Sequence, residues 1–140
     1  MKVERRKLER VPVVTVYKGS LDAAAERGCI LFFHGLGASK DVQLPDLESL
    51  AARGFLVVGV DSVGHGERRY PDFGRRLSKT NPDFEREFLT VVLKTAEEVP
   101  LLIDRLTQAG LIRDGRVGVA GISMGGFIRP LAKVDVQRSE

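Results

Sequence analysis

The stretch Arg116-Val117-Gly118-Val119-Ala120-Gly121-Ile122-Ser123-Met124-Gly125 begins as a short apolar run and passes directly into a serine flanked by glycines. A run of this kind is typical of a buried strand. Gly121 and Gly125 lie two residues before and two residues after Ser123, and glycines at these positions leave room for the chain to fold back. We therefore predict that Ser123 lies on a sharp turn between a strand and a helix, with its hydroxyl above the sheet.

Three further apolar runs precede this turn, at residues 11–17, 29–33 and 55–60. A helical spacing of leucines follows the second run over residues 44–51, with Gly54 as its stop signal. Continuous apolar runs that alternate with helical segments are typical of a parallel sheet covered on both faces. The sequence therefore predicts an α/β fold with a mostly parallel sheet flanked by helices.

The segment between the third and fourth strands has two parts. Residues 62–82 are rich in Gly, Arg, Pro and Asp, so we expect a long loop or excursion there. A long helix should follow, with Asn81 as its N-cap and Pro82 in its first position. Pro100 should kink that helix or divide it into two helices.

Composition narrows the class of protein. The chain has 140 residues, of which 43% are hydrophobic and 29% charged, with a net charge of +3, so we expect one domain over residues 1–140. Basic and acidic residues are interleaved, which argues against a nucleic-acid partner.

Cys29 is the only cysteine, and there is no cluster typical of a metal or phosphate-cofactor site. The charged start at residues 1–10 and the lack of a long apolar stretch predict a cytoplasmic protein without a membrane partner.

Two more motifs follow predicted strands, Phe33-His34-Gly35-Leu36-Gly37 and Asp61-Ser62-Val63-Gly64-His65-Gly66. A backbone N–H group in the first motif is suitably located to face the Ser123 turn. Acyl transfer places negative charge on the former carbonyl oxygen, and two such donors would stabilise it. The expected donors are the amides of Leu36 and Met124.

These three motifs, in this order, resemble the α/β-hydrolase superfamily over roughly residues 10–127. The likeness is to its small esterases and its dienelactone-hydrolase-like or prolyl-oligopeptidase-like members, and residues 95–100 are similar to that branch as well. The resemblance implies that Ser123 is the nucleophile on a nucleophile elbow. It also implies the roles of the supporting residues: oxyanion donors Leu36 and Met124, loop-shaping His34 and His65, strand-end Asp61, and motif glycines Gly35, Gly37, Gly121 and Gly125.

The chain departs from the family's pattern soon after Phe127. Pro130 should terminate or kink the helix after the elbow, and residues 134–140 read as a polar tail. The family places its triad acid and histidine after the nucleophile, but no histidine follows Ser123. We therefore expect a C-terminally incomplete hydrolase domain whose open sheet edge favours self-association.

Two functional hypotheses follow. The first is a serine hydrolase that cleaves a carboxylic ester of a small or medium acyl group through an acyl-Ser123 intermediate, without a cofactor. Its general base would be a displaced His65 or a residue of a second chain. The second is a catalytically incomplete hydrolase-like fragment or binding module that lacks the triad acid and histidine.

Overall fold

The computed structural model of the chain describes residues 1–131. In chain order the elements are β1 (Lys2–Leu8), β2 (Val11–Tyr17), α1 (Leu21–Arg27), β3 (Cys29–Phe33), α2 (Leu44–Ala51), β4 (Leu56–Val60), the 3-10 turn η1 (Gly66–Arg68), α3 (Phe73–Arg76), α4 (Phe84–Gln108), β5 (Val117–Gly121) and α5 (Met124–Leu131). Within these residues, no helix combines the length and apolar character needed to cross a membrane.

The strands form one sheet in the order β1-β2-β4-β3-β5. Strands β4, β3 and β5 are parallel neighbours, whereas β2 is antiparallel to both β1 and β4. All strands except β2 therefore point the same way, which confirms the predicted mostly parallel α/β sheet. Parallel neighbours need a crossover between them. Helix α2 lies in the crossover from β3 to β4, and α4 lies in the chain between β3 and its other neighbour, β5.

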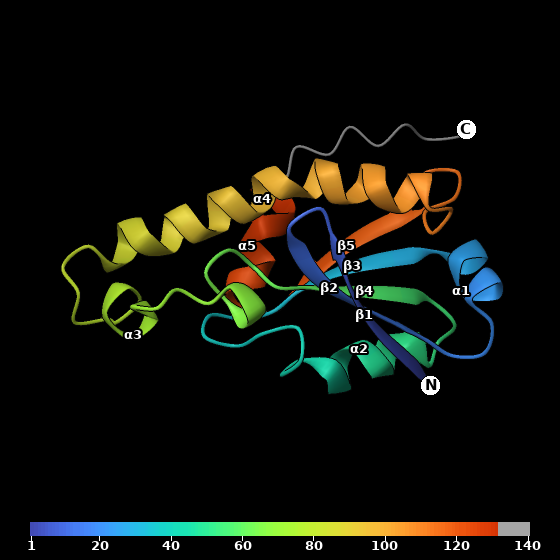
Figure 1. Cartoon of the computed structure of the whole chain (residues 1–140), viewed down its shortest axis with the longest axis horizontal. Coiled ribbons are helices and arrows are strands. Elements are labelled where there is room, and N and C mark those ends of the chain that lie inside the picture. Colours follow the sequence, from blue (N-terminus) through green and yellow to red (C-terminus); the bar gives the residue numbers. More distant parts are fainter. Residues whose placement is uncertain (132–140) are drawn as a thin grey trace.

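Helices cover both faces of the sheet, with α4 and α5 on one side and α2 on the other (Figure 1). Because side chains alternate along a strand, β3 contributes to both cores. Phe33 belongs to the larger core with residues of α4, and Phe32 packs in the smaller core with Leu47 of α2. This double coverage explains why β3 is a continuous apolar run.

Two elements were not expected from the sequence. Strand β1 lies in the stretch interpreted as a charged, solvated start, and it pairs with β2 along its whole length. It is an edge strand, where charged side chains protect against unwanted pairing. Helix α1 begins after Ser20, whose hydroxyl accepts a hydrogen bond from the Ala23 amide at 3.1 Å. That serine cap is a sequence signal that could have identified the helix.

The proline predictions need correction. Helix α4 begins at Phe84, not at Pro82, and the Asn81 side chain instead accepts a hydrogen bond from the Asp83 amide at 3.0 Å. Pro100 does not divide α4, which is one helix (Figure 1). Buried neighbours such as Val99 hold it against the core and offset the roughly 3 kcal/mol cost of an interior proline. Likewise α5 continues through Pro130. The tail expected over 134–140 lies outside the described residues.

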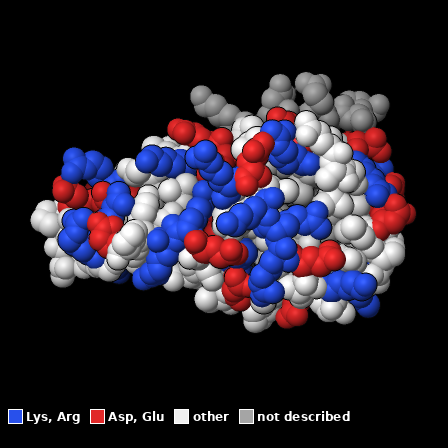
Figure 2. Space-filling model, in the orientation of Figure 1, with Lys and Arg blue, Asp and Glu red and all other residues white. Residues whose placement is uncertain are grey.

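The predicted excursion at 62–82 contains two short helical pieces, η1 and α3. Its arginines are engaged within the fold. Arg68 pairs with Glu98 of α4 at 2.6 Å, and the Arg76 guanidinium lies 3.9 Å from the centre of the Tyr70 ring. Figure 2 shows Lys and Arg among Asp and Glu on one face of the molecule, as the interleaving in the sequence indicates.

Candidate active site

The three sequence motifs meet at one edge of the sheet. His34 follows β3, Asp61 follows β4, and Ser123 lies two residues after β5. Since β3 lies between β4 and β5, the loop after β3 lies between the other two. The carboxyl edge of parallel strands is where α/β proteins bind ligands.

Ser123 lies at a strained turn between β5 and α5. Its φ of 55° is in the left-handed region, which an L-residue adopts at a cost of roughly 1 kcal/mol. The amide of Ile122 donates to the Phe33 carbonyl at 3.1 Å, and the Gly126 amide donates to the Ser123 carbonyl at 2.9 Å. These bonds attach the turn to β3 on one side and to α5 on the other, and Ser123 is exposed to solvent.

The two glycines of the turn are required by close packing. A Cβ atom on Gly121 would lie 2.8 Å from the amide nitrogen of Gly126, and one on Gly125 would lie 2.7 Å from the Phe33 carbonyl carbon and 2.9 Å from the His34 carbonyl oxygen. All three neighbours are backbone atoms that cannot rotate away. The glycine spacing recognised in the sequence therefore reflects direct contact between the turn, α5 and the end of β3.

The loop after β3 lies beside the Ser123 turn. A Cβ atom on Gly35 would lie 3.5 Å from Cβ of Ser123. The Ala38 amide donates to the Gly35 carbonyl at 3.1 Å, and Gly37 has φ +79°, the value that glycine supplies at the third position of a type II turn. Leu36 is thereby presented at the top of a tight turn next to the serine.

The amides of Leu36 and Met124 share one property, which the Ser123 amide has as well. Within residues 1–131, neither donates a hydrogen bond to a protein acceptor, whereas Gly35 and Gly37 donate to side chains and Gly125 donates to a carbonyl. Most backbone donors in a folded protein are paired. Two unpaired donors on the turns that flank a serine are what an oxyanion site requires.

His34 is fully buried and both of its ring nitrogens are occupied. Nδ1 donates to the Gly35 carbonyl at 2.8 Å, and Nε2 accepts from the Ser62 amide at 3.0 Å. Burial lowers the pKa of His34, although the bond to Gly35 and the charge of Asp61 oppose that shift. The ring therefore links the two loops as a neutral group and has no free nitrogen to receive a proton from Ser123.

His65 has the same arrangement one step away. Its Nδ1 donates to the Val63 carbonyl at 3.0 Å, and its Nε2 accepts from the Gly37 amide at 3.1 Å. Burial lowers the pKa of His65 to about 4, and the nearby His34 contributes to the lowering while the bond to Val63 opposes it. A general base needs an available nitrogen within reach of the proton that it accepts, and in this arrangement His65 has none.

Asp61 lies at the centre of a charge cluster that the sequence did not indicate. Its carboxylate accepts hydrogen bonds from the Lys40 amide at 3.0 Å, from the Lys40 ammonium at 2.8 Å and from the Glu67 amide at 3.0 Å. Among the described residues, no histidine nitrogen bonds to it. A Cβ on Gly66, whose φ is +59°, would overlap this carboxylate, which explains that glycine.

Two buried hydroxyls nearby differ in their hydrogen bonding. Thr95 of α4 accepts from the Val63 amide at 3.0 Å, whereas within the described chain the Ser62 hydroxyl has no partner.

We expect Thr95→Val to destabilise the fold by about 1–3 kcal/mol because it leaves a partly buried N–H unpaired. Ser62→Ala should be neutral or stabilising, since it removes a group that is already unsatisfied. Urea unfolding of both variants checks this, and equal losses would contradict it.

Cys29 is not a second nucleophile at this edge. It begins β3, at the opposite end of that strand from His34, and it is buried. Burial raises the pKa of its thiol to about 12, so the reactive thiolate does not form near neutral pH. Among residues 1–131, no group of three or more His, Cys, Asp or Glu side chains could hold a metal ion.

Comparison with known proteins supports the same class of protein as the geometry of the site does. The chain is 34% identical over 98 residues to the putative esterase YitV of Bacillus subtilis, which covers 70% of the chain and 36% of YitV. It is 29% identical over 126 residues to the esterase YjfP of Escherichia coli, covering 89% of the chain and 47% of YjfP. The crystal structure of TT1662 from Thermus thermophilus superposes with a TM-score of 0.73 at 28% identity, covering 91% of the chain and 48% of TT1662. No protein-family model matches the sequence.

The chain belongs to the α/β-hydrolase superfamily, as its sheet, its three strand-end motifs and these relatives show. It spans about a third to a half of the length of the curated relatives that it matches, 36% of one and 47% of the other.

Proposed function

We propose that this chain carries the nucleophile and the oxyanion donors of an esterase that acts on small-molecule carboxylic esters. Ser123 would attack the carbonyl carbon of the ester. The amides of Leu36 and Met124 would donate hydrogen bonds to the oxygen of the tetrahedral intermediate, which collapses to an acyl-Ser123 ester and releases the alcohol. Water then hydrolyses the acyl group. Both relatives that match the sequence are named as esterases.

The observation that carries the proposal is the exposed Ser123 between two unpaired amides. The left-handed turn is part of this argument, because a strained strand-to-helix turn is how α/β-hydrolases present a nucleophile. Losing one oxyanion donor costs an enzyme about 100- to 1000-fold in rate. Amides that are already free of protein acceptors can bind the oxyanion without breaking another hydrogen bond.

The proposal requires a general base other than the two histidines in their present positions. Each ring has both nitrogens engaged in hydrogen bonds. Serine at its ordinary pKa is a weak nucleophile until a base accepts its proton. The base is therefore supplied by another group, such as a residue of a second chain, and without it we expect slow acylation.

The engagement of both nitrogens of His34 and of His65 in hydrogen bonds favours a second candidate function. If no base reaches Ser123, the site remains able to bind the carbonyl oxygen of an ester without cleaving it. The chain would then be a binding module with a hydrolase fold. The two candidates differ in turnover, since only the first predicts release of the alcohol that depends on Ser123.

The test measures hydrolysis of 4-nitrophenyl acetate by the purified chain, with and without added imidazole as an external base. We expect the wild type to release nitrophenol faster than the same solution without protein, both with and without imidazole. Ser123→Ala should remove this excess under both conditions. Ser20→Ala is the matched control, because Ser20 caps α1 at the opposite end of β3 and should leave the rate unchanged. Mass spectrometry should find one acetyl group on Ser123 in the wild type.

Equal rates for the wild type and Ser123→Ala, with and without imidazole, would reject the esterase proposal. Binding of a phenylboronic acid without turnover would then support the binding module.

The same samples are examined by sedimentation velocity. We propose that the edge of β5 opposite β3, with the exposed side chains of Ile122 and Phe127 nearby, mediates self-association. A monomer at all concentrations would exclude that role.

A further inference from the structure

Lys40 is a fully buried lysine whose three ammonium protons all have carboxylate acceptors. Nζ lies 2.8 Å from Asp61, 2.6 Å from Glu67 and 3.1 Å from Asp41. Burial alone would lower the pKa of Lys40, but the hydrogen bonds to these carboxylates outweigh burial and raise it. The side chain is therefore charged and fixed in one position, which is rare for lysine.

The cluster joins two loops that are distant in sequence. Lys40 ends the turn segment 35–40 that follows β3, whereas Asp61 and Glu67 belong to the segment that follows β4. Asp61 binds Lys40 twice, through the ammonium and through the backbone amide. The bond from the Gly37 amide to His65 forms a second connection between the same segments.

These connections surround the Leu36 amide without using it. Gly35, Gly37, Ala38 and Lys40 donate their amides to protein acceptors, whereas among the described residues the amides of Leu36 and Ser39 have none. The segment is neither helix nor strand, so no ladder of backbone bonds fixes its orientation. Its position depends on the side chains that anchor it.

We propose that Lys40 is a positioning residue for the oxyanion site, which fixes the 35–40 turn against the loop after β4 so that the Leu36 amide keeps its direction. This inference rests on the proposed function for its catalytic consequence. Stability alone is a poor explanation of the cluster, because replacing a buried ion pair by apolar groups is often neutral or stabilising. An ion pair with several fixed hydrogen bonds, in contrast, specifies a geometry.

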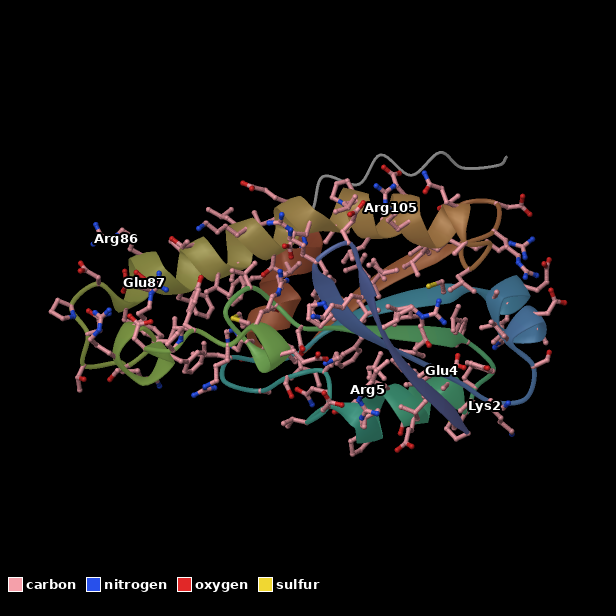
Figure 3. The ribbon with its side chains drawn as sticks, viewed as in Figure 1. Lys2, Glu4, Arg5, Arg86, Glu87 and Arg105 are labelled. Carbon is pink, nitrogen blue, oxygen red and sulfur yellow. The ribbon has the colours of Figure 1, made fainter. Side chains whose placement is uncertain are left out.

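The experiment compares Lys40→Met, the double variant Lys40→Met/Asp61→Asn and Arg5→Met. The double variant removes both buried charges, and the asparagine oxygen can still accept one of the two backbone hydrogen bonds that the Asp61 carboxylate accepts, from Lys40 or from Glu67. It therefore separates lost positioning from an uncompensated buried charge. Arg5→Met is the matched control. Arg5, labelled in Figure 3, lies on β1. It pairs with Asp41 at the exposed rim of the same cluster, at 2.6 Å with about half of its side chain exposed, and such pairs contribute little.

Amide hydrogen exchange by NMR measures the turn directly. In both Lys40 variants we expect the Gly37 amide to exchange about 10- to 100-fold faster, while amides of β3 and β4 change much less, because local opening is separate from global unfolding. Arg5→Met should leave the Gly37 amide unchanged. An unchanged Gly37 amide in the double variant, or an equal acceleration at Gly37 and in β3, would overturn the proposal.

The catalytic consequence has its own measurement. For 4-nitrophenyl acetate, we expect kcat of the double variant to fall by about 10- to 100-fold with KM nearly unchanged, since the oxyanion donor acts mainly in the transition state. A change in KM alone would overturn this consequence. If the wild type shows no turnover that depends on Ser123, the proposed function fails, and the exchange measurement still decides whether Lys40 positions the turn.

Discussion

Replacing Gly125 by alanine should destabilise the fold by about 3–5 kcal/mol, at the upper end of what overpacking costs. The new methyl group would overlap the carbonyl group of Phe33, with its carbon only 2.7 Å away. That carbonyl belongs to β3, which is paired with a strand on each side. The Phe33 backbone therefore cannot move away without breaking the sheet. Because domains are stable by only about 5–15 kcal/mol, this loss would remove a large share of the stability. Urea titration followed by circular dichroism measures the loss.

Gly126→Ala provides the matched control for this prediction. A Cβ there would find its nearest neighbour, the Gly121 carbonyl oxygen, at 3.9 Å, which is an ordinary contact. Gly126 lies inside α5, so alanine should stabilise the helix by about 0.5–1 kcal/mol. Similar urea midpoints for the two variants would show that the turn does not depend on the close approach at Gly125.

Acid should destabilise the protein through His65, which is buried as a neutral ring. The pKa of His65 is lowered from 6.5 to about 4 in the folded state. Above pH 6.5, neither the folded nor the unfolded state binds this proton. As the pH falls from 6.5 to 4, the unfolded state binds it and the folded state does not, so the free energy of unfolding falls by about 3 kcal/mol. Below pH 4 both states are protonated and this contribution no longer changes.

The measurement is the free energy of unfolding of the wild type and of His65→Gln at several pH values from 7 to 4. Other groups titrate in both proteins, including His34, whose pKa is also lowered, so the difference between the two curves isolates His65. The wild type should lose more stability than the variant over this range. Parallel curves would mean that His65 titrates normally and is not held by the bond from Gly37.

The elements that the sequence predicted best are those whose signal is local. Strands β3 and β4 are continuous apolar runs because helices cover both of their faces, whereas β5 is only partly buried. The glycines around Ser123 reflect direct contact with the backbone. Strand β1 was missed because an edge strand exposes most of its side chains, so its residues look like a charged surface. Division of the helix at Pro100 was wrongly expected, because the propensity of one residue is weak against the buried face of a long helix.

The Lys40 cluster was outside the reach of sequence reasoning for a different reason. Lys40 and Asp61 are 21 residues apart, and nothing local distinguishes them from the many paired charges of the surface. Only the sheet order, with β4 beside β3, brings them together. For the histidines, the family resemblance implied a role in shaping loops, and in the structure each ring bonds to backbone groups of the loops after β3 and β4.

The loops after β3 and β4 are joined by three separate connections, from His34 to Ser62, from Gly37 to His65 and from Lys40 to Asp61. In the language of protein engineering, they form one module. Transferring either loop alone to another scaffold would carry along buried donors or charges whose partners stay behind, at a cost of several kcal/mol. Exchange of active-site loops in this fold should therefore move residues 34–40 and 61–68 together.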